Sequence, residues 1–173
     1  DVLFGDFNPS GKLPVTFYKN TDQLPDFEDY SMKNRTYRYM TEVPLFPFGY
    51  GLSYTTFNIS KGRLNKKTIS AGQDLNFKVN VKNTGKYDGA EVIQVYVRKV
   101  DDAEGPIKSL RAFRRVPLKA GETCVVSIDL LPTTFEFFDP TTNTMRIMPG
   151  KYEIMYGNSS DIPSGNKLSV TLR

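Results

Sequence analysis

The feature that most constrains the fold is a series of short apolar runs after residue 70, separated by turn residues. In the first run, Leu75, Phe77, Val79 and Val81 alternate with polar residues. This two-residue period puts one set of side chains on a buried sheet face and the other in water. Turn signals recur about every 8 to 12 residues or somewhat more, which is typical of a β-sandwich.

Later runs continue this pattern. Residues 90–97 (AEVIQVYV) are apolar on both faces, so we expect a central strand that is covered on both sides. Further strands are expected near residues 110–116, 124–130, 135–138, 145–148, 151–156 and 168–172. About seven to nine strands with little helix predict a mainly β protein, an immunoglobulin-like or fibronectin type III-like β-sandwich. A closed barrel is the less favoured alternative.

An aromatic and proline-rich segment precedes the sandwich. Residues 44–57 read PLFPFGYGLSYTTF, with five aromatic rings, two prolines and two glycines. Pro44 and Pro47 lack backbone donors, so regular structure is disfavoured, yet rings of this size are strong packing devices. We therefore expect the rings to dock between two parts of the protein. The five rings are those of Phe46, Phe48, Tyr50, Tyr54 and Phe57. Upstream, only residues 12–17 (KLPVTF) resemble a strand.

The residue inventory excludes several kinds of chemistry. The chain contains no histidine, so neither a histidine-based triad nor a typical zinc site is expected. The single cysteine, Cys124, lies in an alternating run and is expected to be a small buried hydrophobe. We predict no catalytic residue, metal ligand or cofactor site in these residues.

Charge and hydropathy bear on possible partners. The net charge of +4 is a modest excess spread along the chain. The densest basic run, residues 61–67 (KGRLNKK), alternates with apolar residues and favours a solvated edge strand over a phosphate-binding patch. No apolar run approaches the roughly 18 residues of a membrane helix. We expect neither nucleic acid nor a membrane as a partner.

Two acidic clusters and a set of tyrosines suggest alternative functions: catalysis, metal binding or sugar binding. Asp26, Glu28 and Asp29 could form an acid/base pair, but Pro25 beside them favours a solvated loop. Residues 101–104 (DDAE) lack the spacing of a calcium loop, and the following Gly-Pro favours a turn. A carbohydrate-binding module would need exposed rings, for which the candidates are Tyr87, Tyr96, Tyr152 and Tyr156. An interaction domain is a third possibility, although no motif supports it.

Five stretches in order resemble one family. They are GDFNPSGKLPVTF (5–17), YRYMTEVPLFPFGYGLSYTTF (37–57), VKNTGKYDGAEVIQVYV (81–97), KSLRAFRRVPLKAGET (108–123) and PGKYEIMYGNSS (149–160). Together they resemble the C-terminal end of a glycoside hydrolase family 3 enzyme of the β-glucosidase or β-xylosidase type. The chain begins with Asp1 and not with methionine, and residues 1–5 (DVLFG) look like the end of an apolar element whose beginning is missing, so we interpret the chain as a fragment.

The resemblance implies a parent enzyme with a catalytic barrel, an α/β sandwich domain and a terminal fibronectin type III-like domain. Such enzymes are retaining glycosidases whose two catalytic carboxylates lie in the first two domains. Residues 1–57 would be the tail of the α/β domain (residues 1–36) plus a linking strap (residues 37–57), and residues 58–173 the sandwich. The implied role is a non-catalytic scaffold partnered by the catalytic domains of the same chain, with self-association through the strap as a further possibility. A periplasmic or secreted location is implied as well.

Overall fold

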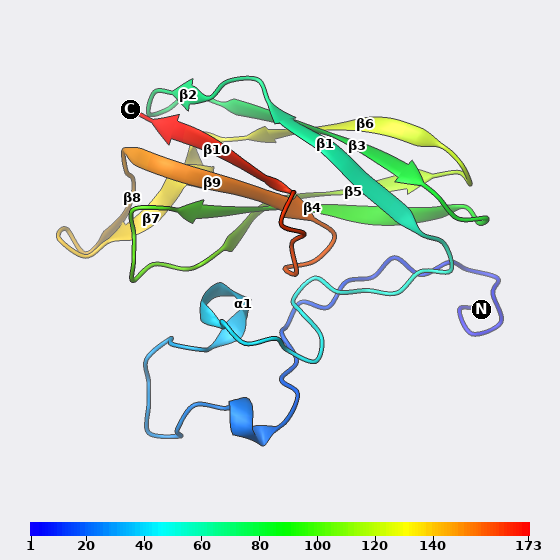
Figure 1. Ribbon diagram of the computed structural model, residues 1–173, viewed down its shortest axis with the longest axis horizontal. Helices are drawn as coiled ribbons and strands as arrows, with labels where there is room; N and C mark the ends of the chain where they lie inside the picture. Colours follow the sequence, from blue (N-terminus) through cyan, green and yellow to red (C-terminus); the bar gives the residue numbers. More distant parts are fainter.

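The computed structural model describes residues 1–173, and two stacked sheets form its main body (Figure 1). A three-stranded sheet has the order β1-β3-β6, and a five-stranded sheet has the order β2-β10-β9-β4-β5. All strand pairs are antiparallel except β2 with β10. The mainly β sandwich predicted from the alternating runs is confirmed.

The strands are β1 (Phe57–Leu64), β2 (Thr68–Ile69), β3 (Leu75–Asn83), β4 (Gly89–Lys99), β5 (Ser109–Leu118), β6 (Thr123–Leu130), β7 (Glu136–Asp139), β8 (Thr144–Ile147), β9 (Gly150–Gly157) and β10 (Lys167–Leu172). The strands β7 and β8 form a separate hairpin. Helical structure is limited to α1 (Thr36–Tyr39) and the 3-10 turns η1 (Thr21–Gln23) and η2 (Pro132–Phe135). No helix has the length and apolar character needed to span a bilayer.

The core lies between the two sheets and follows the alternation in the sequence. Leu75, Phe77, Val79 and Val81 are completely buried on β3, as their two-residue spacing predicts. They pack in a cluster of 20 buried residues drawn from both sheets. Each such side chain contributes roughly 1.5–3 kcal/mol when removed from water, so this cluster is the main stabilising element of the sandwich.

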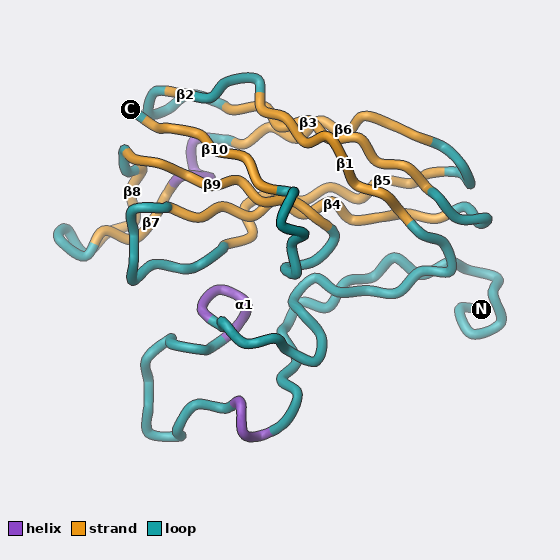
Figure 2. The backbone as a smooth tube through the Cα atoms, viewed as in Figure 1, coloured by secondary structure: helices purple, strands orange, loops and turns teal.

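The strand β4 lies inside the five-stranded sheet between β9 and β5 and is buried on both faces. Ile93, Val95 and Val97 belong to the core cluster. Gln94 and Tyr96 are also buried, and both contact other polar groups outside that cluster. The prediction of a central, doubly covered strand is confirmed, and residues 1–56 supply the second cover (Figure 2).

Three local expectations require correction or refinement. The strand expected at residues 12–17 is wrong, because Pro14 withholds a donor and only Phe17 forms a β-bridge, with Phe46. The strand expected near residues 110–116 is present as β5, but its Phe113 is exposed, because a three-residue spacing puts it on the opposite face from Val116. Cys124 is only partly buried, although it packs on the core as expected and burial raises the pKa of its thiol.

The basic run at residues 61–67 begins within β1, which is an edge strand of the three-stranded sheet. The register of β1 against β3 shifts between Ser60 and Arg63, and Lys61 in this shift has a left-handed φ of 55°. A bulge and exposed basic side chains are two devices that prevent an edge strand from pairing with other chains. The edge-strand interpretation of this run is therefore confirmed.

Candidate interdomain seam

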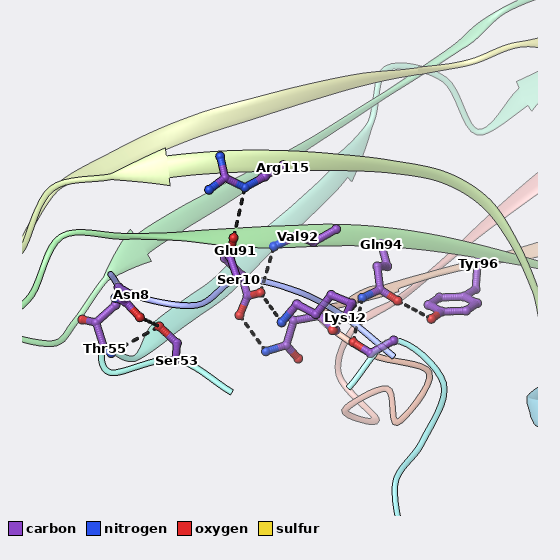
Figure 3. Close-up of polar contacts among 12 residues, drawn as sticks. Asn8, Ser10, Lys12, Ser53, Thr55, Glu91, Val92, Gln94, Tyr96 and Arg115 are labelled. Atoms are coloured by element: carbon purple, nitrogen blue, oxygen red, sulfur yellow. Dashed lines mark hydrogen bonds and ion pairs between the residues drawn. The ribbon is translucent and has the colours of Figure 1, made fainter. Parts of the chain in front are cut away.

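The contact surface between residues 1–56 and the sandwich, called the seam below, is held by a buried ion pair. Lys12 Nζ lies 2.6 Å from Glu91 Oε1, and the two side chains are 14% and 6% exposed. The pairing of β4 with β9 begins only at Gln94, so Glu91 lies where β4 has no hydrogen-bonded neighbour on that side. Glu91 also accepts hydrogen bonds from Asn158 Nδ2 (2.9 Å) and Val92 N (2.8 Å). The buried carboxylate is thus fully paired (Figure 3).

A second buried polar group, the Gln94 amide, joins three segments. Its Nε2 donates to the carbonyl oxygens of Gly49 (3.1 Å) and Asn158 (2.7 Å), and its Oε1 accepts from the Tyr96 hydroxyl (2.5 Å). Burial raises the pKa of the Tyr96 phenol, so the hydroxyl stays protonated and remains a donor. Because the amide uses both donors and its acceptor, its position is fixed.

Gly49 is required where the strap meets this amide. Its φ of +78° lies in the left-handed region that favours glycine. A Cβ at this position would also collide with the Gln94 amide. The backbone of the strap therefore approaches β4 more closely than any side chain at residue 49 would permit.

Asn8 connects the first residues to both the strap and the sandwich. Its Nδ2 donates to Asp88 O (2.8 Å), and its Oδ1 accepts from Ser53 Oγ (2.9 Å) and Tyr54 N (2.9 Å). Nearby, Arg115 Nε donates to Ser10 Oγ (3.1 Å). These bonds position residues 8–10 along the end of the sandwich where β4 begins (Figure 3).

The five predicted packing rings occupy two environments. Phe48 stacks on Tyr37 with ring centroids 4.2 Å apart, and Tyr37 meets Tyr96 of β4 edge-on at 5.8 Å. Phe57 opens β1 and packs against the core. In contrast, Phe46 and Tyr50 stack on each other at 5.2 Å, Phe46 meets Phe17 edge-on, and Phe46 and Tyr54 remain exposed. The Phe57 ring thus packs directly on the sandwich, the Phe48 ring reaches it through Tyr37, and the other three lie on the side of residues 1–36.

The acidic clusters form only local contacts. The carboxylates of Asp26 and Asp29 accept backbone hydrogen bonds from Glu28 and Ser31, two residues on in each case, as in ordinary turns. Hydrogen bonds from Ser31 lower the pKa of the Asp29 carboxyl, which suits an ionised surface group. In the second cluster, Asp101 accepts from Lys151 N. No group of three or more histidine, cysteine or carboxylate residues has the arrangement of a metal site.

The tyrosines proposed for sugar stacking do not form a platform. Tyr96, Tyr152 and Tyr156 are buried, and only Tyr87 is exposed. The Tyr152 hydroxyl donates to Met148 O, and burial raises its pKa to about 12. Three of the four rings are interior packing residues, so this part of the carbohydrate-module alternative is wrong.

Sequence reasoning missed the polar residues of the seam: Lys12, Glu91, Gln94 and Asn158. One signal was available. Glu91 and Gln94 interrupt a run that is otherwise apolar on both faces, and a polar residue in such a strand needs a buried partner. Nothing in the sequence indicated Lys12 or Asn158 as those partners, because the contacts join distant segments.

The structure is a β-sandwich with an aromatic-rich segment docked against it, and comparison with known proteins identifies both parts. The model of the glycosyl hydrolase family 3 C-terminal domain matches residues 1–54, and that of the fibronectin type III-like domain matches residues 91–160. The chain belongs to glycoside hydrolase family 3 and corresponds to the accessory C-terminal part of its relatives.

Relatives of the chain are glycosidases of bacteria and fungi. It is 55% identical over 99% of its length to a xylan 1,4-beta-xylosidase of Xylanibacter ruminicola and 38% identical over 92% to a periplasmic beta-glucosidase of Salmonella typhimurium. The solved beta-glucosidase of Listeria innocua matches 99% of the chain with a TM-score of 0.80 and 33% identity. The chain covers 20% and 22% of the two curated relatives and 25% of the solved structure.

The close approach at Gly49 can be tested by Gly49→Ala, with Gly121→Ala as the matched control. Gly121 has nearly the same φ (+77°) but nothing within 4 Å of its Cβ position. In both variants, strain in the backbone should lower the free energy of unfolding by about 1–3 kcal/mol. Gly49→Ala should lower the free energy of unfolding by about 1–3 kcal/mol more, because the new Cβ collides with the Gln94 amide, which must move. Denaturant unfolding measures both, and equal losses would contradict the close contact.

The ion pair can be tested by Lys12→Met. This change leaves the Glu91 carboxylate buried without its cation, which typically costs about 3–5 kcal/mol. We expect residues 1–56 to detach and become sensitive to protease, while the sandwich stays folded. Lys19→Met is the control, because the Lys19 side chain is exposed and makes no ion pair. Equal protease resistance of Lys12→Met and the parent would show that the pair does not hold the seam.

Proposed function

We propose that this chain braces the catalytic domains of a retaining glycosidase that hydrolyses terminal β-linked xylose or glucose. The observation that carries the proposal is the distribution of exposed apolar side chains. Fifteen of the 22 large hydrophobic residues that are exposed lie within residues 1–54, less than a third of the chain. Leu3, Phe4, Phe27 and Tyr30 are the most exposed, at 88–92%. Such a concentration favours a covering partner.

The catalytic domains of the same polypeptide are the proposed cover. In the relatives, the matched region is a fifth to a quarter of a longer chain. The match to the family 3 C-terminal domain ends at residue 54, close to the start of β1 at Phe57. This supports a boundary between residues 57 and 58, with residues 1–57 as tail and strap and residues 58–173 as the sandwich.

The five rings would then connect the two sides. Phe57 packs on the sandwich core, Phe48 reaches Tyr96 through Tyr37, and Phe46, Tyr50 and Tyr54 lie toward residues 1–36. Because the buried ion pair and the Gln94 amide fix residues 8–12 and 49 on β4, a domain that covers residues 1–36 is held at a defined position relative to the sandwich. We infer that orienting that domain is the role of the seam.

The proposed substrates follow from the named activities of the relatives, which are β-xylosidases and β-glucosidases. Retaining hydrolysis needs a carboxylate nucleophile and a carboxylic acid/base about 5 Å apart. In this proposal the covering domains supply both carboxylates. The 173-residue chain holds those domains in position and provides no catalytic residue.

The first test is enzymatic. The purified chain should hydrolyse neither aryl β-xylosides nor aryl β-glucosides, and calorimetry should detect no binding of xylose, glucose or their β-linked oligomers. Turnover that rises with the concentration of this chain would contradict the non-catalytic assignment. Saturable binding of a neutral sugar would favour the carbohydrate-module alternative.

The second test concerns the uncovered apolar surface. Without its cover, the chain should self-associate as its concentration rises, and sedimentation velocity should detect this. Phe4→Ser combined with Phe27→Ser should reduce the association without changing the melting temperature, because both rings are almost fully exposed. Phe113→Ser, an exposed ring of β5, is the matched control and should leave association unchanged. A parent chain that stays monomeric at all concentrations would contradict the proposed face.

A further inference from the structure

A small pocket at the α1 side of the seam is lined by residues of α1, of the loop after β4 and of the β7–β8 hairpin, together with Arg111 of β5. Its volume is about 230 Å³. Two arginines and a set of aromatic and thioether side chains line it: Arg38, Arg111, Tyr39, Phe137, Phe138 and Met145. The pocket therefore combines positive charge with apolar walls.

The two guanidinium groups lack an anionic partner. Arg111 Nη2 donates to Glu136 O (2.5 Å), and the group lies 4.8 Å from the Phe137 ring centroid. The Arg38 guanidinium lies over the Tyr39 ring and donates to no protein group. The Nε atoms of both are buried without hydrogen-bond partners, and neither residue belongs to any of the four ion pairs of the structure.

This arrangement is electrostatically unfavourable as it stands. Burial and the nearby charge of Arg38 lower the pKa of the Arg111 guanidinium, and the Glu136 carboxylate raises it by less. An arginine nevertheless stays protonated in proteins, so two like charges share the pocket. Both arginines are partly exposed, so the cost of removing their charges from water is smaller than for a fully buried ion, and a negatively charged ligand would offset it.

The carboxylates at the pocket edge do not fill this role. The Asp102 carboxylate is turned over its own loop, where a Cβ on Gly105 would collide with it. Glu104 is exposed. Neither forms an ion pair with the arginines, and their negative charge disfavours a second full negative charge on the ligand. A monoanion thus fits better than a phosphate dianion.

We propose that this pocket binds a carboxylate group through Arg38 and Arg111. A planar carboxylate matches the paired donors of a guanidinium. The walls formed by Phe137, Phe138 and Met145 suit an apolar body next to the carboxylate. Two sources carry this chemistry: a free sugar acid, and an acidic side chain from another part of the polypeptide. The proposal does not depend on the bracing role.

The test is an NMR titration of the 173-residue chain, observed at the arginine Nε–H resonances. Acetate and glucuronate should shift the Arg38 and Arg111 signals saturably in the millimolar range, corresponding to about −4 kcal/mol, and glucose should not. Added salt should weaken binding. Arg38→Gln should weaken it at least about tenfold, a change of about 1.4 kcal/mol. Arg63→Gln, an exposed arginine of β1, should bind like the parent.

The relative affinities distinguish the two sources. Glucuronate binding at least about tenfold tighter than acetate assigns the pocket to a sugar acid, because the ring then adds contacts. Equal affinities assign it to an acidic side chain. The proposal is overturned if neither anion shifts the two signals saturably, if Arg38→Gln binds as well as the parent, or if glucose produces the same shifts.

Discussion

The buried contacts on the outer face of β4 are the constraint on which the arrangement of the molecule depends. One face of β4 contributes Ile93, Val95 and Val97 to the sandwich core, as in any sandwich strand. The other face carries Gln94 and Tyr96, and Glu91 lies beyond the end of the β9 pairing. These polar groups would be costly to bury alone. Residues 1–56 supply their partners, so the segment and the sandwich form one structure.

The two parts of the chain are stabilised differently, and this decides what the sequence could predict. The sandwich follows from a local rule, since the two-residue period fixes which side chains enter the core, and β3, β4, β6, β9 and β10 appear where the pattern places them. The seam depends on contacts between distant segments. Glu91 and Gln94 were visible as polar residues in a buried strand, but no local pattern indicates that Lys12, Gly49 and Asn158 meet them.

The errors have the same origin. Residues 12–17 have the composition of a strand, yet their neighbours in space are residues 45–50, whose Pro47 and Gly49 prevent a regular ladder. The exposed Phe113 illustrates the reverse case, because it is apolar and yet the two-residue period of β5 points it outward. Hydrophobicity alone therefore does not predict the structure at either place. The partner in space decides the conformation of residues 12–17, and the strand period decides the exposure of Phe113.

The polar character of the seam has a functional consequence. An apolar interface tolerates sliding, whereas a buried ion pair and a saturated amide are satisfied in one register only, so they favour orientation over added stability. The pair of Lys12 and Glu91 therefore fixes the direction in which residues 1–36 leave the sandwich. In the proposed role, the exposed rings of that segment, Phe4, Phe27 and Tyr30 among them, would meet the covering domain. A rigid seam next to an uncovered apolar segment is what a brace requires, because position is transmitted only through contacts that cannot shift.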